Sequence, residues 1–149
     1  MSGKKINMEK NSTEVTQVLE AYKSAVLEKN VDAFMQLYDV NARIFDTWGV
    51  WLFDKADSRL PNIKKWFEGL GDERVVVNFD DVRVTSRNDM AIVTAVGTYA
   101  AVSVSGVELR SMQNRFTWAL EFSESGWKII HEHTSVPIGD DLTAKLVRN

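Results

Sequence analysis

The stretch that most restricts the fold runs from Gly126 to Pro137, with the sequence Gly-Trp-Lys-Ile-Ile-His-Glu-His-Thr-Ser-Val-Pro. Its β-branched and aromatic residues, with glycine before and proline after, predict a β-strand. Because side chains alternate along a strand, one face carries apolar bulk first and two imidazoles further on. The members of this face are Trp127, Ile129, His131, His133 and Ser135. This pattern is unusual for a core strand and predicts that its far end lines a pocket.

The segment before this strand extends the pattern. Residues 116–122 alternate as well, and residues 123–126 form a turn, so a β-hairpin is expected. Directly opposed residues of a hairpin share a face, unless a β-bulge breaks the register. The predicted pairs are Phe122 with Trp127, Leu120 with Ile129, Trp118 with His131, and Phe116 with His133. The predicted pocket cluster is Phe116, Trp118, His131 and His133, with Asn114 and Ser135 beyond.

The N-terminal part of the chain has the spacing of an α-helix. Apolar residues recur every three or four positions, which predicts a helix over about 12–29. The preceding residues 1–10 are polar and are expected to form a loose tail. Residues 11–138 would then form a single domain, and the tail over 139–149 would be a brief helix or a disordered end.

Further helices and then strands follow. A short helix over about 32–38, opened by Asp32, and a strand over 42–45 precede a third helix that begins at Pro61 and stops at Gly71. The rest of the chain alternates in long runs, which predicts antiparallel strands. Helices followed by strands indicate an α+β fold, with the helices on one face of a curved sheet. Such a sheet forms a cone whose open end is a pocket.

Composition excludes several classes of function. The chain has 149 residues, a formal net charge of -3 and no Cys. An acidic chain does not favour nucleic-acid binding, which usually needs a basic face. There is no apolar run of about 18 residues for a membrane span and no secretory signal, so the cytoplasm is the expected location.

The order of helices and strands resembles the NTF2-like superfamily, whose fold is the cystatin-like cone. The segment from Gly126 to Pro137 is similar to the ending of the SnoaL-like and ketosteroid isomerase-homologue families. Its Trp…His-x-His-x-Ser pattern also resembles the association domain of calcium/calmodulin-dependent kinase II. The resemblance extends from about Glu14 to Pro137, and it implies the fold more specifically than the function, because this fold carries unrelated activities.

A second resemblance lies in the first half of the chain. The spacing from Tyr22 to Asp46 is similar to that of ketosteroid isomerase without a gap. The resemblance implies that Tyr22 is an oxyanion-hole tyrosine and that Asp46 is a general base moving a proton between carbons. The third position, a protonated carboxylic acid in that family, falls at about Trp118. An indole N–H is a weaker hydrogen-bond donor to an oxyanion than a neutral carboxylic acid is. The kinase association domain has an arginine at the position of Trp118.

The residues around Asp46 and Tyr22 allow two interpretations each. Asp46 follows Phe45 and precedes Trp48, so a partly desolvated carboxylate suited to a general base is expected. The alternative is a turn aspartate that binds nearby amides. Tyr22 lies on the apolar stripe of the first helix, where it is either a hydrogen-bond donor for a ligand or an ordinary core tyrosine.

The two histidines allow three interpretations. A metal site would need further ligands, and with no Cys in the chain Asp46 or Glu108 would have to supply them. The second interpretation is that His131 acts as a general acid or base beside Asp46. The third, that both imidazoles are structural or lie at a dimer contact, is favoured, and no metal or other cofactor is expected.

Because side chains alternate along a strand, the two arginines Arg110 and Arg115 are expected on opposite faces of the sheet. Aromatic residues are expected to form the apolar walls of the pocket. Arg110 shares the inward parity and would bind an anionic ligand near the rim, whereas Arg115 would face a subunit interface, or both are solvated charges. Ligand sites are mostly apolar with few polar groups. The side chains expected to line the pocket are Trp48, Asn114, Phe116, Trp118 and His133.

The leading hypothesis is a SnoaL-like domain that binds a small hydrophobic molecule and works as an isomerase, cyclase or dehydratase. Asp46 would abstract a proton next to a carbonyl, Tyr22 and Trp118 would hold the enolate oxygen, and His131 would relay the proton. The alternative is a non-catalytic oligomerisation or binding module like the kinase association domain. Self-association through apolar residues on the outer face of the sheet is expected in either case. A homodimer favours the small-molecule pocket, and a ring of many subunits favours the assembly module. The candidates for that face are Val75, Val77, Ile130 and Val136.

Overall fold

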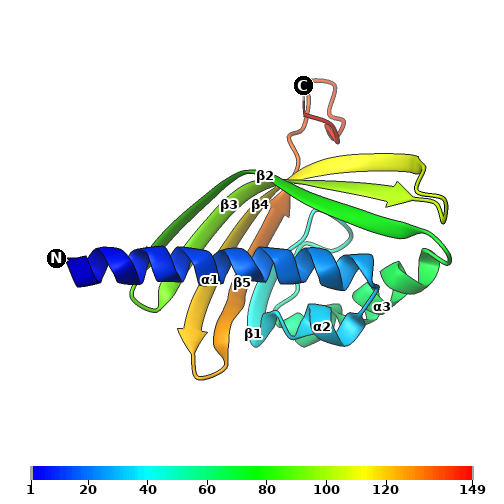
Figure 1. Cartoon of the computed structure of the whole chain (residues 1–149). Helices are drawn as coiled ribbons and strands as arrows, with labels where there is room; N and C mark the ends of the chain where they lie inside the picture. Colours follow the sequence, from blue (N-terminus) through cyan, green and yellow to red (C-terminus); the bar gives the residue numbers. More distant parts are fainter. Residues whose placement is uncertain (1, 149) are drawn as a thin grey trace.

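The computed structural model describes residues 2–148, and the side chains from Lys10 onward, as helices packed on one face of a five-stranded sheet (Figure 1). The predicted α+β class is confirmed. The elements are α1 (Ser2–Leu27), α2 (Val31–Met35), β1 (Tyr38–Phe45), the 3-10 helix η1 (Ala56–Arg59), α3 (Leu60–Gly69), β2 (Arg74–Arg87), β3 (Met90–Val102), β4 (Glu108–Ser123) and β5 (Gly126–Ser135).

Helix α1 begins at Ser2 rather than near residue 12. The predicted loose tail is therefore wrong for residues 2–10, while residue 1 lies outside the described residues and the proposed domain bounds stay a prediction. Most of these residues are compatible with a helix, and no proline interrupts them, so the helix continues beyond the core. The stripe that packs on the sheet is Val15, Val18, Leu19, Tyr22, Ala25 and Val26, all buried.

The short elements that follow differ slightly from the prediction. Asn30, not Asp32, caps α2, because its side-chain oxygen accepts the N–H of Ala33 at 3.0 Å. Helix α3 has Pro61 in its first turn, as predicted. No helix in the described part of the chain is long and apolar enough to cross a membrane.

The sheet has the strand order β1-β5-β4-β3-β2, with β1 parallel to β5 and the other pairs antiparallel. In Figure 1 the long strands pass behind α1, and α2 and α3 lie at the end of the sheet near β1. The core lies between these helices and the inner face of the sheet. Val75 and Val77 belong to this core, so their predicted place on the outer face is wrong.

The β4–β5 hairpin leaves the predicted register at Ile130. The two pairs nearest the turn are as predicted, but Ala119 then pairs with His131, so Ile130 is an extra residue without a partner. Beyond this bulge Trp118 opposes Glu132 and Phe116 opposes Thr134, not the two histidines. One extra residue exchanges the faces of the strand, so the predicted cluster of histidines with Phe116 and Trp118 is wrong.

The C-terminal segment is neither of the two predicted forms. It turns back on itself at an isolated bridge between Ile138 and Ala144 and then runs along β4. The backbone N–H of Gln113 donates to the carbonyl of Leu146 at 2.7 Å, and the Gln113 side chain accepts from the Arg148 N–H at 2.6 Å. These bonds bring Leu146 to the open end of the sheet.

Candidate functional site

A cavity of about 680 Å³ lies between α1, α3, the loop after β1 and the inner face of the sheet. Its walls are mainly apolar, and a few polar side chains interrupt them, which is the usual composition of a small-molecule site. Apolar walls include Trp48, Phe53, Ile63, Trp66, Met112 and Phe116. The polar side chains include Tyr22, Asp46, Arg59, Tyr99, Asn114 and Thr134.

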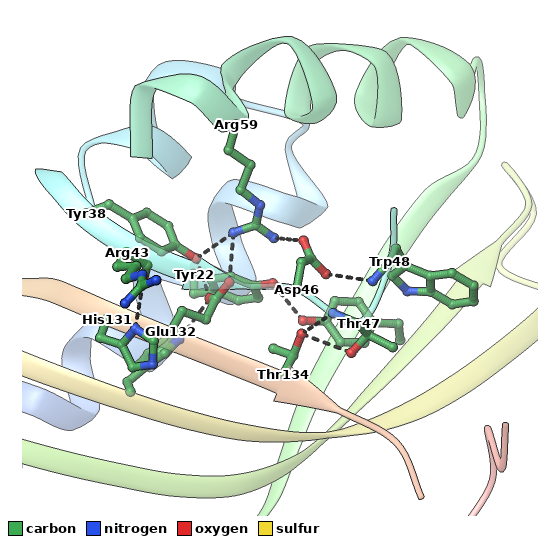
Figure 2. A network of polar contacts seen from close by, with 12 residues as sticks. Tyr22, Tyr38, Arg43, Asp46, Thr47, Trp48, Arg59, His131, Glu132 and Thr134 are labelled. Carbon is green, nitrogen blue, oxygen red and sulfur yellow. Dashed lines mark hydrogen bonds and ion pairs between the residues drawn. The ribbon is translucent and has the colours of Figure 1, made fainter. Parts of the chain in front are cut away.

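Arg59 links two carboxylates at the wall of the cavity. It is buried at the end of η1, next to Pro61 and the start of α3. Its Nη1 donates to Glu132 Oε2 and its Nη2 donates to Asp46 Oδ2, both at 2.8 Å (Figure 2). The guanidinium also lies over the rings of Phe34 and Tyr38 at 5.7 and 5.9 Å. These contacts hold the arginine in a single orientation.

Glu132 is fully buried on β5 and is surrounded by donors. Besides Arg59, its Oε1 accepts the Tyr38 hydroxyl at 2.5 Å and the Trp118 indole N–H at 2.9 Å. These donors satisfy the oxygens of the buried carboxyl group, as burial of a polar group requires. Burial works to lower the pKa of Arg59, but Glu132 and then Tyr38 and Asp46 outweigh it and hold that pKa well above its ordinary value. Arg59 therefore remains a guanidinium cation.

Asp46 lies where the cluster meets the cavity. Its side chain is 17% exposed, with Oδ2 on Arg59 and Oδ1 accepting only a longer bond of 3.3 Å from the Trp48 N–H. Thr134 fixes the chain after β1, because its hydroxyl oxygen accepts from both the N–H and the hydroxyl of Thr47 at 2.9 Å. The predicted site residue Asp46 is thus on the cavity wall, with Oδ1 less engaged than Oδ2.

Tyr22 lines the cavity from α1, and its partner is another tyrosine. Its hydroxyl is 2.6 Å from the Tyr99 hydroxyl on β3. Burial raises the pKa of both phenols far above the usual value, so both stay protonated. The predicted residues Trp48, Asn114 and Phe116 also line the cavity, with Trp48 largely exposed.

Trp118 and the two histidines are placed elsewhere. Trp118 is buried and does not line the cavity, and its indole N–H donates a hydrogen bond to Glu132. His131 Nδ1 is 2.7 Å from the carbonyl oxygen of Arg43, and both imidazoles pack edge-on against Phe45 on the side of the sheet away from the cavity. Among the described residues no group of three or more potential ligands is arranged to hold a metal.

The two arginines singled out by parity have protein partners. Arg110 lies at the rim, where its Nη2 is 2.7 Å from Glu73 Oε2, so its charge is matched. Arg115 donates to the Ser135 hydroxyl at 3.1 Å and faces away from the cavity.

Sequence reasoning missed Arg59 and Glu132. Simple alternation along residues 126–137 predicts Glu132 on the face opposite the two histidines, away from the pocket. Two consecutive isoleucines, Ile129 and Ile130, interrupt that alternation and are a sign of a bulge. Arg59 lies in an irregular segment just before Pro61, and no local pattern distinguishes it from a solvated arginine. Only the tertiary structure brings Arg59 into contact with Glu132 on β5.

Comparisons with known proteins agree with this architecture. The model of the SnoaL-like domain family matches residues 15–139. An NTF2-like protein of unknown function from Pseudomonas putida KT2440 superposes with a TM-score of 0.81 at 18% identity, covering 95% of this chain and 99% of that one. A comparison with curated proteins gives no match.

Two further solved structures have the same fold. A proposed dehydratase of the NTF2-like family from Streptomyces avermitilis has a TM-score of 0.75 at 15% identity, with coverage of 88% and 99%. A proposed calcium/calmodulin-dependent protein kinase II association domain from Xanthomonas campestris has a TM-score of 0.65 at 20% identity, with coverage of 82% and 84%. The cone with its helices and five-stranded sheet is the NTF2-like, cystatin-like fold, and the chain belongs to the SnoaL-like domain family.

Proposed function

We propose that this protein binds a small, largely apolar carbonyl compound in the cavity and transfers a proton without a cofactor, with Asp46 as the base. One observation carries the proposal: a carboxylate at the wall of an apolar cavity is fixed through one oxygen by the buried Arg59–Glu132 pair. A positioned base of this kind contributes about 10²–10⁴-fold to a proton transfer.

The environment of Asp46 suits this role. Arg59 holds Oδ2 and leaves Oδ1 with only the long bond from Trp48, so Oδ1 is the atom available to a ligand. Glu132 balances the positive charge of Arg59, and the three groups together carry a formal charge of -1. Arg59 therefore orients the base without leaving a net positive charge beside it. The apolar walls exclude water and strengthen every polar contact with the ligand.

The reaction follows from these groups. Asp46 takes a proton from the carbon next to the carbonyl, the C–H electron pair forms a carbon–carbon double bond, and the carbonyl electrons move to oxygen to give an enolate. In a β,γ-unsaturated ketone the protonated Asp46 then returns the proton to the γ carbon while the carbonyl re-forms and the double bond moves, which completes an isomerisation. In a β-hydroxy ketone the carbonyl re-forms, the C–O bond breaks, and the departing hydroxyl takes the proton as water, which completes a dehydration. Tyr22 remains the proposed donor to the enolate oxygen; Trp118 is not proposed again, because Glu132 occupies its N–H. The dehydratase proposed among the structural neighbours belongs to the same class of chemistry.

Hydrogen–deuterium exchange tests the base without knowledge of the natural substrate. Tetralones and acetylnaphthalene are incubated in D₂O with the protein, and deuterium at the carbon next to the carbonyl is measured by mass spectrometry. We expect the wild type to accelerate exchange of at least one ketone, and Asp46→Asn to lower that acceleration about 100-fold or more.

Asp54→Asn is the matched control, because Asp54 is an exposed acid on the same loop that does not line the cavity. It should exchange at the wild-type rate. Equal rates in wild type and Asp46→Asn, with both proteins folded, remove Asp46 as the base.

A second candidate function is an assembly module, and the outward position of His131 and His133 favours it. With Phe45 they form an aromatic and imidazole surface on the outer face of the sheet, and Ile92 on β3 is half exposed. We propose a homodimer through this face. Light scattering tests it: a dimer that His133→Glu dissociates supports the face, and a monomeric wild type removes it.

A further inference from the structure

The C-terminal segment closes one end of the cavity. We refer to residues 140–148 as the strap, which lies beyond the end of β5 (Figure 1). Leu146 on the strap lines the cavity, as do Met112 and Asn114 on either side of Gln113, the β4 residue that the strap binds. Of residues 140–148, all of which the structure describes, Leu146 alone is partly buried. The strap therefore adds one apolar side chain to the cavity wall.

A single residue of β4 provides the main attachment of the strap. The backbone N–H of Gln113 donates to the carbonyl oxygen of Leu146 at 2.7 Å, and Gln113 Oε1 accepts the backbone N–H of Arg148 at 2.6 Å. The exposed ion pair of Arg148 with Asp81, at 3.9 Å, adds little. Each neutral hydrogen bond makes only a modest net contribution to stability. The end of the strap is thus held on the sheet by few contacts.

At this point the strap takes the place of a strand. β5 pairs with β4 as far as Arg115, which is opposite Ser135. Gln113 therefore lies beyond the end of β5, and its backbone N–H needs another partner. The carbonyl of Leu146 is that partner. Because Gln113 is only half-buried, water can satisfy its N–H when the strap leaves, so release does not strand a buried donor.

The base of the strap is held by its own hydrogen bonds. The N–H of Gly139 donates to the carbonyl of Thr143, and the N–H of Lys145 donates to the carbonyl of Pro137, both at 2.9 Å. These bonds form a small hairpin that does not depend on β4. Opening therefore requires only the release of residues 146–148, while the hairpin and the sheet stay folded.

We infer that the strap is a gate: Leu146 closes the end of the cavity beside β4, and release of residues 146–148 from Gln113 admits a ligand. Segments with few buried contacts and surface hydrogen bonds open locally without unfolding of the domain. The match to the SnoaL-like family model ends at residue 139, so the strap follows the segment that identifies the family. The inference concerns access to the cavity and does not depend on Asp46 acting as a base.

Amide hydrogen exchange, followed by NMR at single residues, measures opening of the strap without a ligand. We expect the Gln113 amide to exchange at least about 100-fold faster than the amides of residues 117–120 in the middle of β4. Leu146→Ala weakens the closed strap and should accelerate exchange at Gln113 about fivefold. Leu142→Ala is the matched control, because Leu142 is 84% exposed on the same strap and does not line the cavity. It should leave the rate unchanged.

Binding kinetics test whether this opening admits a ligand. Acetylnaphthalene is mixed with the protein by stopped flow, and tryptophan fluorescence reports binding, since Trp48 and Trp66 line the cavity. Gln113→Ala removes the side-chain acceptor of the strap at a position that does not line the cavity. We expect the association and dissociation rate constants both to rise about threefold, with Kd within about twofold of the wild type, because a looser gate speeds entry and exit alike. Thr98→Ala removes the other partner of the Gln113 side chain and should change neither rate constant.

Several results would overturn the gate. Exchange at Gln113 as slow as in the middle of β4 would make the strap a fixed part of the wall. Equal effects of Leu146→Ala and Leu142→Ala, unchanged rate constants in Gln113→Ala, or an equal change in Thr98→Ala would also contradict it. If acetylnaphthalene does not bind, the ligand class proposed above fails, and the exchange rates still decide whether the strap opens.

Discussion

At the scale of single residues, the site depends on a cluster of buried charged side chains. Arg59 and Glu132 are buried, and Asp46 nearly so, yet each has an oppositely charged partner at 2.8 Å. Burying such groups is expensive, and the cost is offset only when the geometry is good and the remaining atoms are also bonded. Tyr38 and Trp118 supply those remaining bonds to Glu132. Their hydrogen bonds therefore act on Asp46 through Arg59.

Removing one charge of this buried cluster should lower the stability of the fold strongly. Glu132→Gln leaves the buried guanidinium of Arg59 without its better-enclosed partner, and we expect the free energy of unfolding to fall by about 3–5 kcal/mol. Urea denaturation measures this value. Glu73→Gln breaks the exposed ion pair with Arg110 and should leave the midpoint almost unchanged. Similar small effects of both substitutions would show that the buried cluster does not stabilise the fold.

At the scale of elements, the bulge in β5 decides which side chains reach the cavity. Trp127 and Ile129 face inward, as simple alternation predicts. The extra residue Ile130 then places Glu132 and Thr134 on the inner side. Without it, two imidazoles would occupy the wall, and Arg59 would have no buried carboxylate to bind. The chemistry of the site thus follows from one unpaired residue.

The outward position of the histidines can be checked by substitution. The double variant His131→Ala, His133→Ala should bind acetylnaphthalene within about twofold of the wild type, since changes on a surface away from the ligand have small effects. Phe116→Ala, which removes a ring from the cavity wall, should weaken binding clearly. A tenfold loss of affinity in the histidine variant would mean that the imidazoles contact the ligand.

At the scale of the whole molecule, the tyrosines show how completely the helices close over the sheet. The chain has three, Tyr22 on α1, Tyr38 on β1 and Tyr99 on β3. Burial raises the pKa of all three well above the ordinary value, and the nearby Glu132 charge adds to the effect. In the unfolded chain these phenols would ionise near pH 10.

Alkaline titration should therefore be cooperative. Above about pH 10 the unfolded state releases tyrosine protons that the native state keeps, so stability is complete below this pH and falls as the pH rises. We expect the absorbance of phenolate to stay low while the protein is folded and to appear in one step together with the loss of circular dichroism. Gradual ionisation near pH 10 with native circular dichroism would contradict the buried positions.

Much of the fold was predictable because its signals are local. The apolar stripe from Val15 to Val26, the proline of α3 and the long alternating runs each report on neighbouring residues only, and together they indicated an α+β cone. The predicted start of the first helix was wrong because residues 2–10 have no apolar stripe, which is the signal that the prediction used. Helix propensity alone continues α1 through these residues. Asp46 and Tyr22 were found through resemblance, and the structure places both at the cavity, while their roles stay proposals.

The amino-acid sequence by itself determined the class of fold and the order of its elements, because periodicity and turn residues act over a few positions. The resemblance to ketosteroid isomerase, and not periodicity, pointed to Asp46 and Tyr22. Only the tertiary structure decided which face of β5 meets the cavity, since a bulge depends on pairing with strands far along the chain. It likewise decided that Arg59 joins Asp46 to Glu132. Charges separated widely in sequence find each other only when packing removes the water between them.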